Sequence, residues 1–221
     1  MRALHKQWQT NGDNINEERS RNLKEINGHI LEFIPETHQY IVDGILVPCV
    51  SNILAYKFND YSGVSREVLQ RASEKGTELH KVIEDYEQQG ITSDLREFKN
   101  YLFLKKQFKF ENIENEVPVL YERGGQVLFA GTLDQIITID GKLGINDFKR
   151  VSAPNKNKIA YQLNFYKMAY EQSYGKKIEF LSFTHLRETV RKFNRLPINE
   201  EITINLLNEF LEQEKEQCLQ L

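Results

Sequence analysis

Hydrophobic and polar residues alternate along several short stretches near the start of the chain. The segments HILEFI, HQYIVDG and ILVPCVS, between residues 29 and 51, have the two-residue period of half-buried strands, and turn residues separate them. This pattern predicts a β-meander of three short strands. Residues 1–28 before it are polar and poor in aliphatic side chains, which predicts a flexible or loosely docked N-terminal arm.

The rest of the chain changes between helical and strand periodicity. Apolar positions spaced three and four residues apart predict helices at 50–57, 65–89, 94–110, 156–174 and 201–221. Alternating runs predict strands at 113–121, 127–139, 143–149, 178–186 and 190–196. We therefore expect an α/β protein of the mixed α+β kind. A central mixed sheet would be flanked by helices, with the meander and a helical insertion before it, in a single domain spanning residues 29–221.

Composition excludes several classes of protein. The 221 residues are 40% hydrophobic, enough for one full core. No apolar run approaches the length of a membrane span and the N-terminus has no signal-peptide core, so we expect a cytoplasmic protein that does not enter a membrane. Cys49 and Cys218 lie far apart without metal-site spacing, which predicts free thiols and argues against a zinc site, an iron–sulfur cluster or a disulfide framework.

Charge is distributed unevenly along the chain. The net charge is −3, but residues 149–195 contain eleven Lys and Arg against three Asp and Glu, a local charge of +8. A basic region of this kind is typical of a surface that binds nucleic acid, and solvated helix and loop faces are the alternative interpretation.

Two aspartates interrupt the apolar pattern of the strands at 127–139 and 143–149. Asp140-Gly141 between them favours a two-residue type I′ turn, which pairs Ile139 with Lys142 and therefore sets Asp134 opposite Asp147. Their Cβ atoms would lie about 4.5–5.5 Å apart. Lys149, two residues further on, would point to the same face. A three-residue loop would shift this register.

Two like charges facing each other on a half-buried sheet destabilise it, so another group must neutralise them. Mg²⁺ or Mn²⁺ would do so, because these hard cations bind carboxylates and keep open positions for waters and phosphate oxygens. The alternative is an exposed hairpin edge where both carboxylates are solvated. The pattern itself therefore predicts a candidate metal site at Asp134 and Asp147.

Several segments together resemble the RecB-like, phage-type exonuclease branch of the PD-(D/E)XK nuclease superfamily. They are Gly131-Thr132-Leu133-Asp134, Ile145-Asn146-Asp147-Phe148-Lys149, Gln162-x-x-x-Tyr166, Gly76-x-x-x-His80, and the upstream His38-x-Tyr40-x-Val42-Asp43-Gly44 with Val47-Pro48-Cys49-Val50-Ser51. They cover roughly residues 29–190. The sequence departs from the family pattern in three places: no Pro precedes Asp134, Arg150 stands where Thr is common, and Cys49 and Ser51 stand where Ser and Thr are usual. The four cysteines of the iron–sulfur-bearing relatives are absent.

The resemblance implies a restriction-endonuclease-like core and a role for each matched residue. Asp134, Asp147, His80 and the backbone carbonyl of Phe148 would hold Mg²⁺ or Mn²⁺, and Lys149 would orient or deprotonate the attacking water. Glu116 is a further candidate acid, with simple surface exposure as its alternative. For His80 the alternative is a hydrogen-bonded core residue. Gly76 would let the helix that carries His80 approach another backbone closely.

Gln162 and Tyr166 share one helix face and, by the same resemblance, would line the site and help to hold DNA. Packing in the core is the alternative. Further candidates for phosphate contacts come from the basic region: Lys156, Lys158 and Lys167, with Arg187, Arg191, Lys192 and Arg195 as less strongly supported ones.

The function expected from this resemblance is a metal-dependent DNA exonuclease of recombination, replication or repair, acting on linear DNA from its ends. In a phage it would work in the host cytoplasm. A homo-oligomer and a single-strand annealing protein as partner are compatible with the resemblance. The alternatives are a catalytically inactive nucleic-acid-binding or protein-interaction module on the same fold, and a structure-specific endonuclease.

Overall fold

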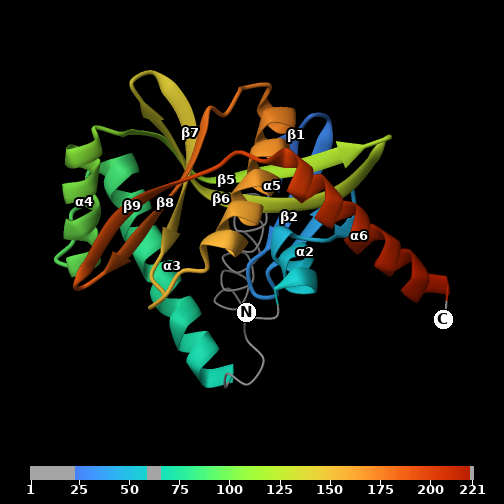
Figure 1. The fold of residues 1–221 in the computed structure, drawn as a ribbon, viewed down its shortest axis with the longest axis horizontal. Coiled ribbons are helices and arrows are strands. Elements are labelled where there is room, and N and C mark those ends of the chain that lie inside the picture. Colours follow the sequence, from blue (N-terminus) through green and yellow to red (C-terminus); the bar gives the residue numbers. More distant parts are fainter. Residues whose placement is uncertain (1–22, 59–65, 220–221) are drawn as a thin grey trace, which may run out of the picture.

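The computed structural model describes residues 23–58 and 66–219, where the chain forms two β-sheets and five helices (Figure 1). The strands are β1 (Leu23–Ile26), β2 (His29–Ile34), β3 (Gln39–Val42), β4 (Ile45–Val47), β5 (Glu111–Arg123), β6 (Gln126–Ile139), β7 (Lys142–Lys149), β8 (Phe180–Arg187) and β9 (Val190–Leu196). The helices are α2 (Val50–Lys57), α3 (Arg66–Gln89), α4 (Arg96–Phe108), α5 (Lys156–Tyr174) and α6 (Glu200–Leu219). No helix in these ranges is both long and apolar enough to cross a membrane.

The larger sheet has the order β5-β6-β7-β8-β9, and β7 and β8 are its parallel pair. Parallel neighbours need a long crossover, which α5 supplies between β7 and β8. The other neighbouring strands are antiparallel and joined by short turns. The sheet is therefore mixed and flanked by helices, as the sequence predicted.

The turn between β6 and β7 is the predicted one. Asp140 and Gly141 have φ of 51° and 76°, the left-handed pair that a type I′ turn requires. Register runs from Ile139↔Lys142 to Gln135↔Asn146, so the pairing deduced from the sequence is confirmed along this hairpin.

The N-terminal meander has four strands, one more than predicted. Leu23–Ile26 lies in the range assigned to the arm, but it forms β1 and pairs with β2. Its sequence, LKEI, is too short and too polar to show a strand period, so the predicted arm boundary at residue 28 is wrong. Residues 1–22 lie outside the described part of the chain. Cys49 is a buried, free thiol as expected, and the side chain of Cys218 also lies outside that part.

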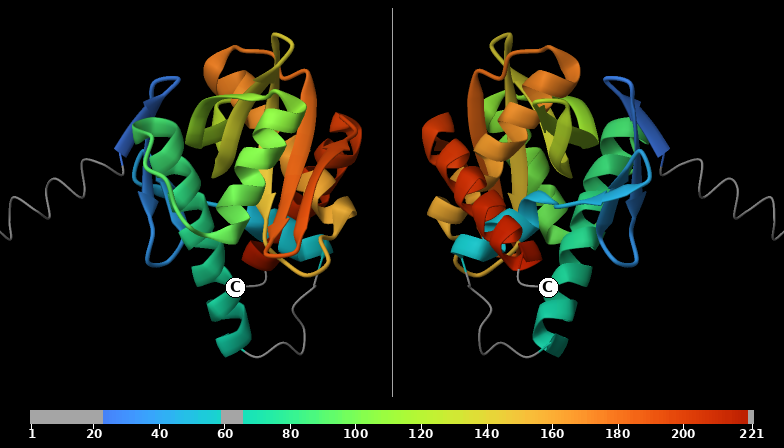
Figure 2. Two further views of the ribbon diagram at one scale, coloured as in Figure 1. Left: turned by 90° about the vertical axis from the view of Figure 1, so that its left-hand side faces the viewer. Right: turned by 90° about the vertical axis from the view of Figure 1, so that its right-hand side faces the viewer.

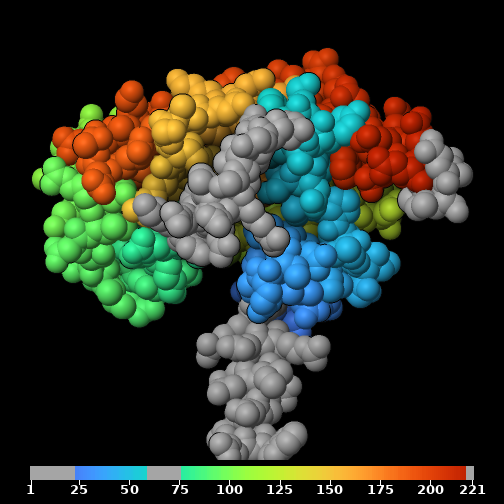
Figure 3. Space-filling model, turned by 90° about the horizontal axis from the view of Figure 1, so that it is seen from below, coloured from blue at the N-terminus to red at the C-terminus, as the bar shows by residue number. Residues whose placement is uncertain are grey.

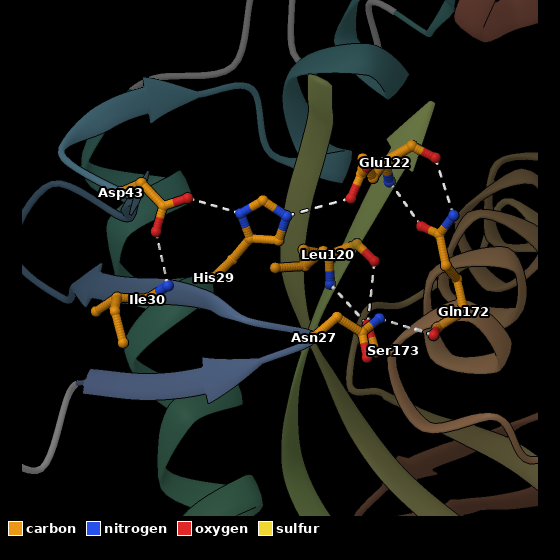
Figure 4. A network of polar contacts seen from close by, with 8 residues as sticks. All are labelled: Asn27, His29, Ile30, Asp43, Leu120, Glu122, Gln172 and Ser173. Atoms are coloured by element: carbon orange, nitrogen blue, oxygen red, sulfur yellow. Dashed lines mark hydrogen bonds and ion pairs between the residues drawn. The ribbon is translucent and has the colours of Figure 1, made fainter. Parts of the chain in front are cut away.

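Polar contacts connect the meander to the larger sheet and to α5 (Figure 4). His29 Nδ1 lies 2.6 Å from Asp43 Oδ2 and its Nε2 lies 3.2 Å from Glu122 Oε2 on β5. Asn27 donates to the carbonyl of Gln172 on α5, 2.9 Å away. A small apolar cluster that includes Leu31, Tyr40, Leu120 and Ala130 packs between the two sheets.

Helices cover both faces of the larger sheet, as the side views show (Figure 2). Helices α2, α5 and α6 pack on one face, where Leu163, Phe165 and Leu207 are fully buried. Helices α3 and α4 pack on the other, around Ile83, Phe98 and Phe148. The candidate site lies where β6 and β7 separate, within reach of α3 and α5.

Candidate metal centre

The two predicted aspartates come together at the end of the β6–β7 ladder. The last paired residues are Gln135 and Asn146, and Asp134 and Asp147 follow them directly. Beyond this point β7 continues beside β8 alone, with Asp147↔Phe183 and Lys149↔His185 in register. Asp134 Oδ2 instead accepts a hydrogen bond of 2.7 Å from the backbone N–H of Phe148. One carboxylate therefore holds the backbone next to the other.

Asp147 is the most constrained charge in the site. Its residue is 1% exposed, and Lys149 Nζ lies 2.6 Å from its Oδ2. Oδ2 therefore has a charged partner, whereas Oδ1 has no hydrogen bond from the described residues. Burial, with a smaller contribution from Asp134, raises the pKa of Asp147 to about 6, although the Lys149 ammonium acts in the opposite direction. A buried carboxylate with vacant lone pairs is suited to a cation.

His80 reaches the same point from α3. Its Nδ1 is 3.3 Å from Glu116 Oε1 and its Nε2 is 3.5 Å from Asp134 Oδ2. Burial disfavours the imidazolium, but the charges of Asp134 and Glu116 outweigh burial and raise the pKa of His80 to about 9. Ligand atoms of His80, Glu116 and Asp134 all lie within 4.8 Å of one another. The structure thus brings together the histidine and both acids.

Gly76 does not have the role that we predicted for it. A Cβ atom added there would meet no atom within 4 Å among the described residues, so no backbone approaches closely. The position of His80 follows instead from packing further along α3, where Leu79 and Ile83 are fully buried beside Phe148. The ring of Phe148 also meets the His80 imidazole edge to face at 5.4 Å.

Glu116 has a left-handed backbone in the middle of a strand. Its φ is +49°, whereas the residues on either side, Asn115 and Val117, pair regularly with Gln135 and Leu133 of β6. A non-glycine residue in this conformation stores strain, which is found most often at functional sites. The kink occurs opposite Asp134, so the strained residue is also the one beside His80.

Helix α5 brings Tyr166 close to Asp134 and Asp147, and the role of Gln162 and Tyr166 in holding DNA stays a prediction. The side chain of Gln162 hydrogen-bonds to Tyr166, and burial, together with the charges of Asp134 and Asp147, raises the pKa of Tyr166 well above its usual value. Gly131 on β6 makes room for this ring, since an added Cβ would lie 2.9 Å from a Tyr166 ring carbon. Tyr166 is nevertheless buried, at 7% exposure, and therefore also belongs to the core.

The predicted phosphate contacts divide into two groups. Lys156 is exposed and Lys158 half-buried, both in the first turn of α5. Lys167 is 6% exposed and forms ion pairs with Glu171, at 2.8 Å, and with Glu200 of α6. The prediction that Lys167 tracks a phosphate backbone is therefore wrong. Five residues beyond Gln162, it lies on a different face of the helix.

An ion pair that we did not predict connects β7 to both helices on the α3 side. Arg150 contacts Glu97 of α4 at 2.7 Å and Glu78 of α3 at 3.3 Å. Glu97 is 3% exposed, so removing Arg150 would leave a buried carboxylate without its ion-pair partner. Two features of the sequence could have indicated this ion pair. Arg150 directly follows Lys149, and Glu97 directly precedes Phe98 on the buried side of its helix. The hydroxyl of Tyr40, a residue of the upstream segment that resembles the family, donates to Thr132 on β6 at 3.1 Å, a contact that the sequence did not predict.

The donor set fits a hard divalent cation. Two carboxylates and one imidazole converge, and the buried carboxylate of Asp147 lies near enough to interact with Asp134 and His80 through its charge. Oxygen ligands with a single nitrogen suit Mg²⁺ or Mn²⁺. Lys149, whose Nζ lies 2.6 Å from Asp147 Oδ2, adds a basic side chain beside this group.

Comparison with known proteins gives little further information. No protein family and no curated protein matches the sequence. Among solved structures, the crystal structure of SSO0001 is similar at 15% sequence identity and a TM-score of 0.42, over 76% of this chain and 75% of that chain. A likeness at this level does not identify a function for the chain.

Proposed function

We propose that this protein is a metal-dependent DNA exonuclease with a RecB-like, PD-(D/E)XK core. The observation that carries the proposal is Asp147, a buried carboxylate with the Lys149 ammonium at one oxygen and no hydrogen bond from the described residues at the other, next to the His80, Glu116 and Asp134 cluster. These residues come from α3, β5, β6 and β7. A purely structural arrangement would gain stability if Asp147 were neutral or fully hydrogen-bonded.

Asp134 and Asp147 would hold the cation, with His80 and Glu116 as further ligands and the Phe148 carbonyl as the one implied by family resemblance. When bound, such a cation polarises a phosphodiester and lowers the pKa of a coordinated water. Lys149 would orient the attacking water and offset negative charge that develops on the phosphate. The hydrogen bond from Phe148 N–H to Asp134 fixes one carboxylate for this task.

DNA is the proposed substrate, because two lysines that follow Lys149 closely in the sequence could contact a phosphate backbone. Lys156 and Lys158 belong to the first turn of α5, the end of a helix that attracts anions. Tyr166 follows on the same helix, near Asp134 and Asp147, with Gln162 hydrogen-bonded to it.

The test is a cleavage assay on end-labelled linear DNA and on closed circular DNA, with Mg²⁺, with Mn²⁺ or with EDTA, beside Asp147→Asn. We expect degradation of linear DNA alone, lost with EDTA and in the variant. Cleavage of closed circular DNA would show that the protein is an endonuclease and not an exonuclease. DNA binding without metal-dependent cleavage under any condition would instead favour an inactive binding module.

A further inference from the structure

Helix α4 exposes a basic stripe on the side that faces away from the core. Arg96, Lys99, Phe103 and Lys106 follow one another at spacings of three and four residues and are all exposed. This places them on one helix face, about 15 Å long from the first to the last. The opposite face, with Phe98, Tyr101 and Leu104, is buried in the core.

Strand β9 lies beside this stripe and continues it. The guanidinium carbon of Arg191 is 3.6 Å from the centre of the Phe103 ring, and that of Arg195 is 3.6 Å from the Phe180 ring. Arg191 and Arg195 are four residues apart in the strand and so point to the same side. Helix α4 and the β9 region are neighbours on the molecular surface, green beside orange-red (Figure 3).

Two contacts hold this surface in place. Buried Asn100 of α4 donates to the carbonyl of Arg187 in β8, 2.8 Å away. Further along, the rings of Phe108 and Phe193 pack at 4.8 Å. The arginines on it are therefore presented by a helix and a strand that are fixed to each other, which lowers the entropy lost when a ligand binds.

Most of its cations lack acidic partners. Within residues 23–58 and 66–219, no carboxylate forms an ion pair with Arg96, Lys106, Arg191 or Arg195, whereas Lys99 pairs with exposed Asp94 at 2.9 Å. Burial lowers the pKa of Arg195, the direction expected of a cation without a nearby acid. In a chain of net charge −3, such a cluster points to an anionic ligand.

We propose that this surface, formed by Arg96, Phe103, Lys106, Arg191 and Arg195 and called here the α4–β9 surface, binds single-stranded DNA. The inference rests on the proposed nuclease function and extends it to the path of the substrate. Phosphates would contact the lysine and the arginines, and unstacked bases would stack on the guanidinium planes and on exposed Phe103.

Sheet register connects the α4–β9 surface to the candidate metal centre. Lys149 pairs with His185 of β8, and His185 pairs with Lys192 of β9. Lys192 therefore lies about 10 Å from Lys149 across two strand spacings and on the same face of the sheet, whereas its neighbour Arg191 points to the opposite face, so the α4–β9 surface and the centre meet around the β9 edge. The cations on β9 also discourage edge pairing with a second copy of the chain, so this edge is better suited to a polyanion than to a strand.

The binding test uses the full chain with Asp147→Asn and EDTA, so that no DNA is cut. Fluorescence anisotropy of a labelled oligothymidylate of about 20 nucleotides is measured over a range of NaCl concentrations. The variant Lys106→Glu with Arg191→Glu should bind at least about 10-fold more weakly, and its log–log salt slope should fall by about 1.4. The matched control, Lys24→Glu with Lys215→Glu, changes two exposed lysines on β1 and α6 and should bind as the parent does.

Equal affinities of the two double variants would overturn the inference. If the charge-reversal variant Lys106→Glu with Arg191→Glu does not fold, as judged by circular dichroism, Lys106→Gln with Arg191→Gln replaces it. Arg191→Lys keeps the charge but removes the planar group, so weaker binding of single strands with unchanged binding of duplex supports stacking. Equal loss for both, or loss for neither, contradicts the single-strand assignment.

The same experiment separates this inference from the proposed function. Because the binding assay requires no cleavage, a chain without nuclease activity can still bind through the α4–β9 surface. Conversely, the protein could be an active nuclease whose affinity for the oligothymidylate is unchanged in Lys106→Glu with Arg191→Glu. The proposed function would then stand and the inference about the α4–β9 surface would be wrong.

Discussion

Two histidines in this protein each lie between two carboxylates, but their surroundings differ. His29 lies between Asp43 and Glu122, at 2.6 and 3.2 Å, and connects the meander to β5 (Figure 4). His80 lies between Glu116 and Asp134, at 3.3 and 3.5 Å, and connects α3 to β5 and β6. Residue types alone would not distinguish them.

The burial and the hydrogen bonds of the neighbouring carboxylates distinguish the two histidines. At His29 the carboxylates are exposed, 48% for Asp43 and 35% for Glu122, and the second oxygen of Asp43 accepts from the N–H of Ile30 at 2.8 Å. At His80, Glu116 is also 40% exposed, but Asp134 is only 13% exposed and the third acid, Asp147, is buried with the Lys149 ammonium at one oxygen and no hydrogen bond from the described residues at the other. The second cluster therefore concentrates negative charge in a more buried place than the first.

Backbone strain differs in the same direction. Asp43 has φ of 52°, but it belongs to an Asp-Gly turn with Gly44, where this conformation is common. Glu116 has nearly the same φ inside a strand. Only the second requires an explanation beyond chain reversal, and a role in holding a ligand supplies one.

The largest effect should come from removing the ion pair that attaches α4 and α3 to the end of β7. Arg150→Ala leaves buried Glu97 without its partner and should lower the free energy of unfolding by about 3 kcal/mol. Urea denaturation measures this. Arg123→Ala, which removes only an exposed hydrogen bond to Asn208, is the control and should change it by less than about 0.5 kcal/mol. Equal effects would mean that Glu97 is not dependent on Arg150.

Metal affinity should distinguish the two histidines directly. His80→Ala removes a candidate ligand and should weaken Mn²⁺ binding by about 10- to 100-fold in isothermal titration calorimetry. His29→Ala should leave the affinity unchanged, because its carboxylates already have partners within the chain. A similar loss in both variants, or in neither, would contradict the assignment of the metal centre to His80.

Stability without metal should distinguish the carboxylates. In EDTA at pH 7, Asp147→Asn removes a buried negative charge and should raise the free energy of unfolding by about 1 kcal/mol, after allowance for the lost contact to Lys149. The folded-state pKa of Asp147 is raised to about 6, so its ionisation lowers stability as pH rises from about 4 to 6, and the gain should shrink towards pH 4.

Asp43→Asn is the matched control for that measurement. It removes an exposed carboxylate that is hydrogen-bonded twice, so it should lower stability slightly and never raise it. Thermal unfolding of both variants beside the parent, in EDTA, gives the comparison. Destabilisation by Asp147→Asn would mean that this carboxylate supports the fold.

Local chemistry explains which parts of the fold could be predicted from sequence. The Asp140-Gly141 turn and the period of β6 and β7 fixed a register that the structure confirms, and this register brought Asp134 and Asp147 together. β1 could not be predicted, because four residues with two charges become a strand only beside β2.

Tertiary contacts explain the rest of the site. Counting charges along the sequence could not distinguish Lys156, which is exposed, from Lys167, which is buried. Lys167 forms ion pairs with Glu171 of the same helix and with Glu200 of α6. Nor could it pair Arg150 with Glu97, more than fifty positions away. Glu116 was a candidate by type and position, but its left-handed backbone depends on pairing with β6 on both sides.

The smallest expected effect is a pH dependence at the exposed cluster. Hydrogen bonds to Asp43 and Glu122 raise the pKa of His29, so its contribution to stability is fully present below pH 6.5 and is lost as pH rises through the folded-state value. The same contact lowers the pKa of Asp43, whose contribution is lost only when pH falls through that lowered value. His29→Gln should therefore reduce the melting temperature by about 2 °C at pH 6 and by less at pH 8.5, because exposed ion pairs are weak. Differential scanning calorimetry in EDTA at both values measures the change. A difference in melting temperature that does not depend on pH would mean that His29 stabilises the protein through packing. His29 would then differ from His80 in the role of its charge as well as in the surroundings of its carboxylate neighbours.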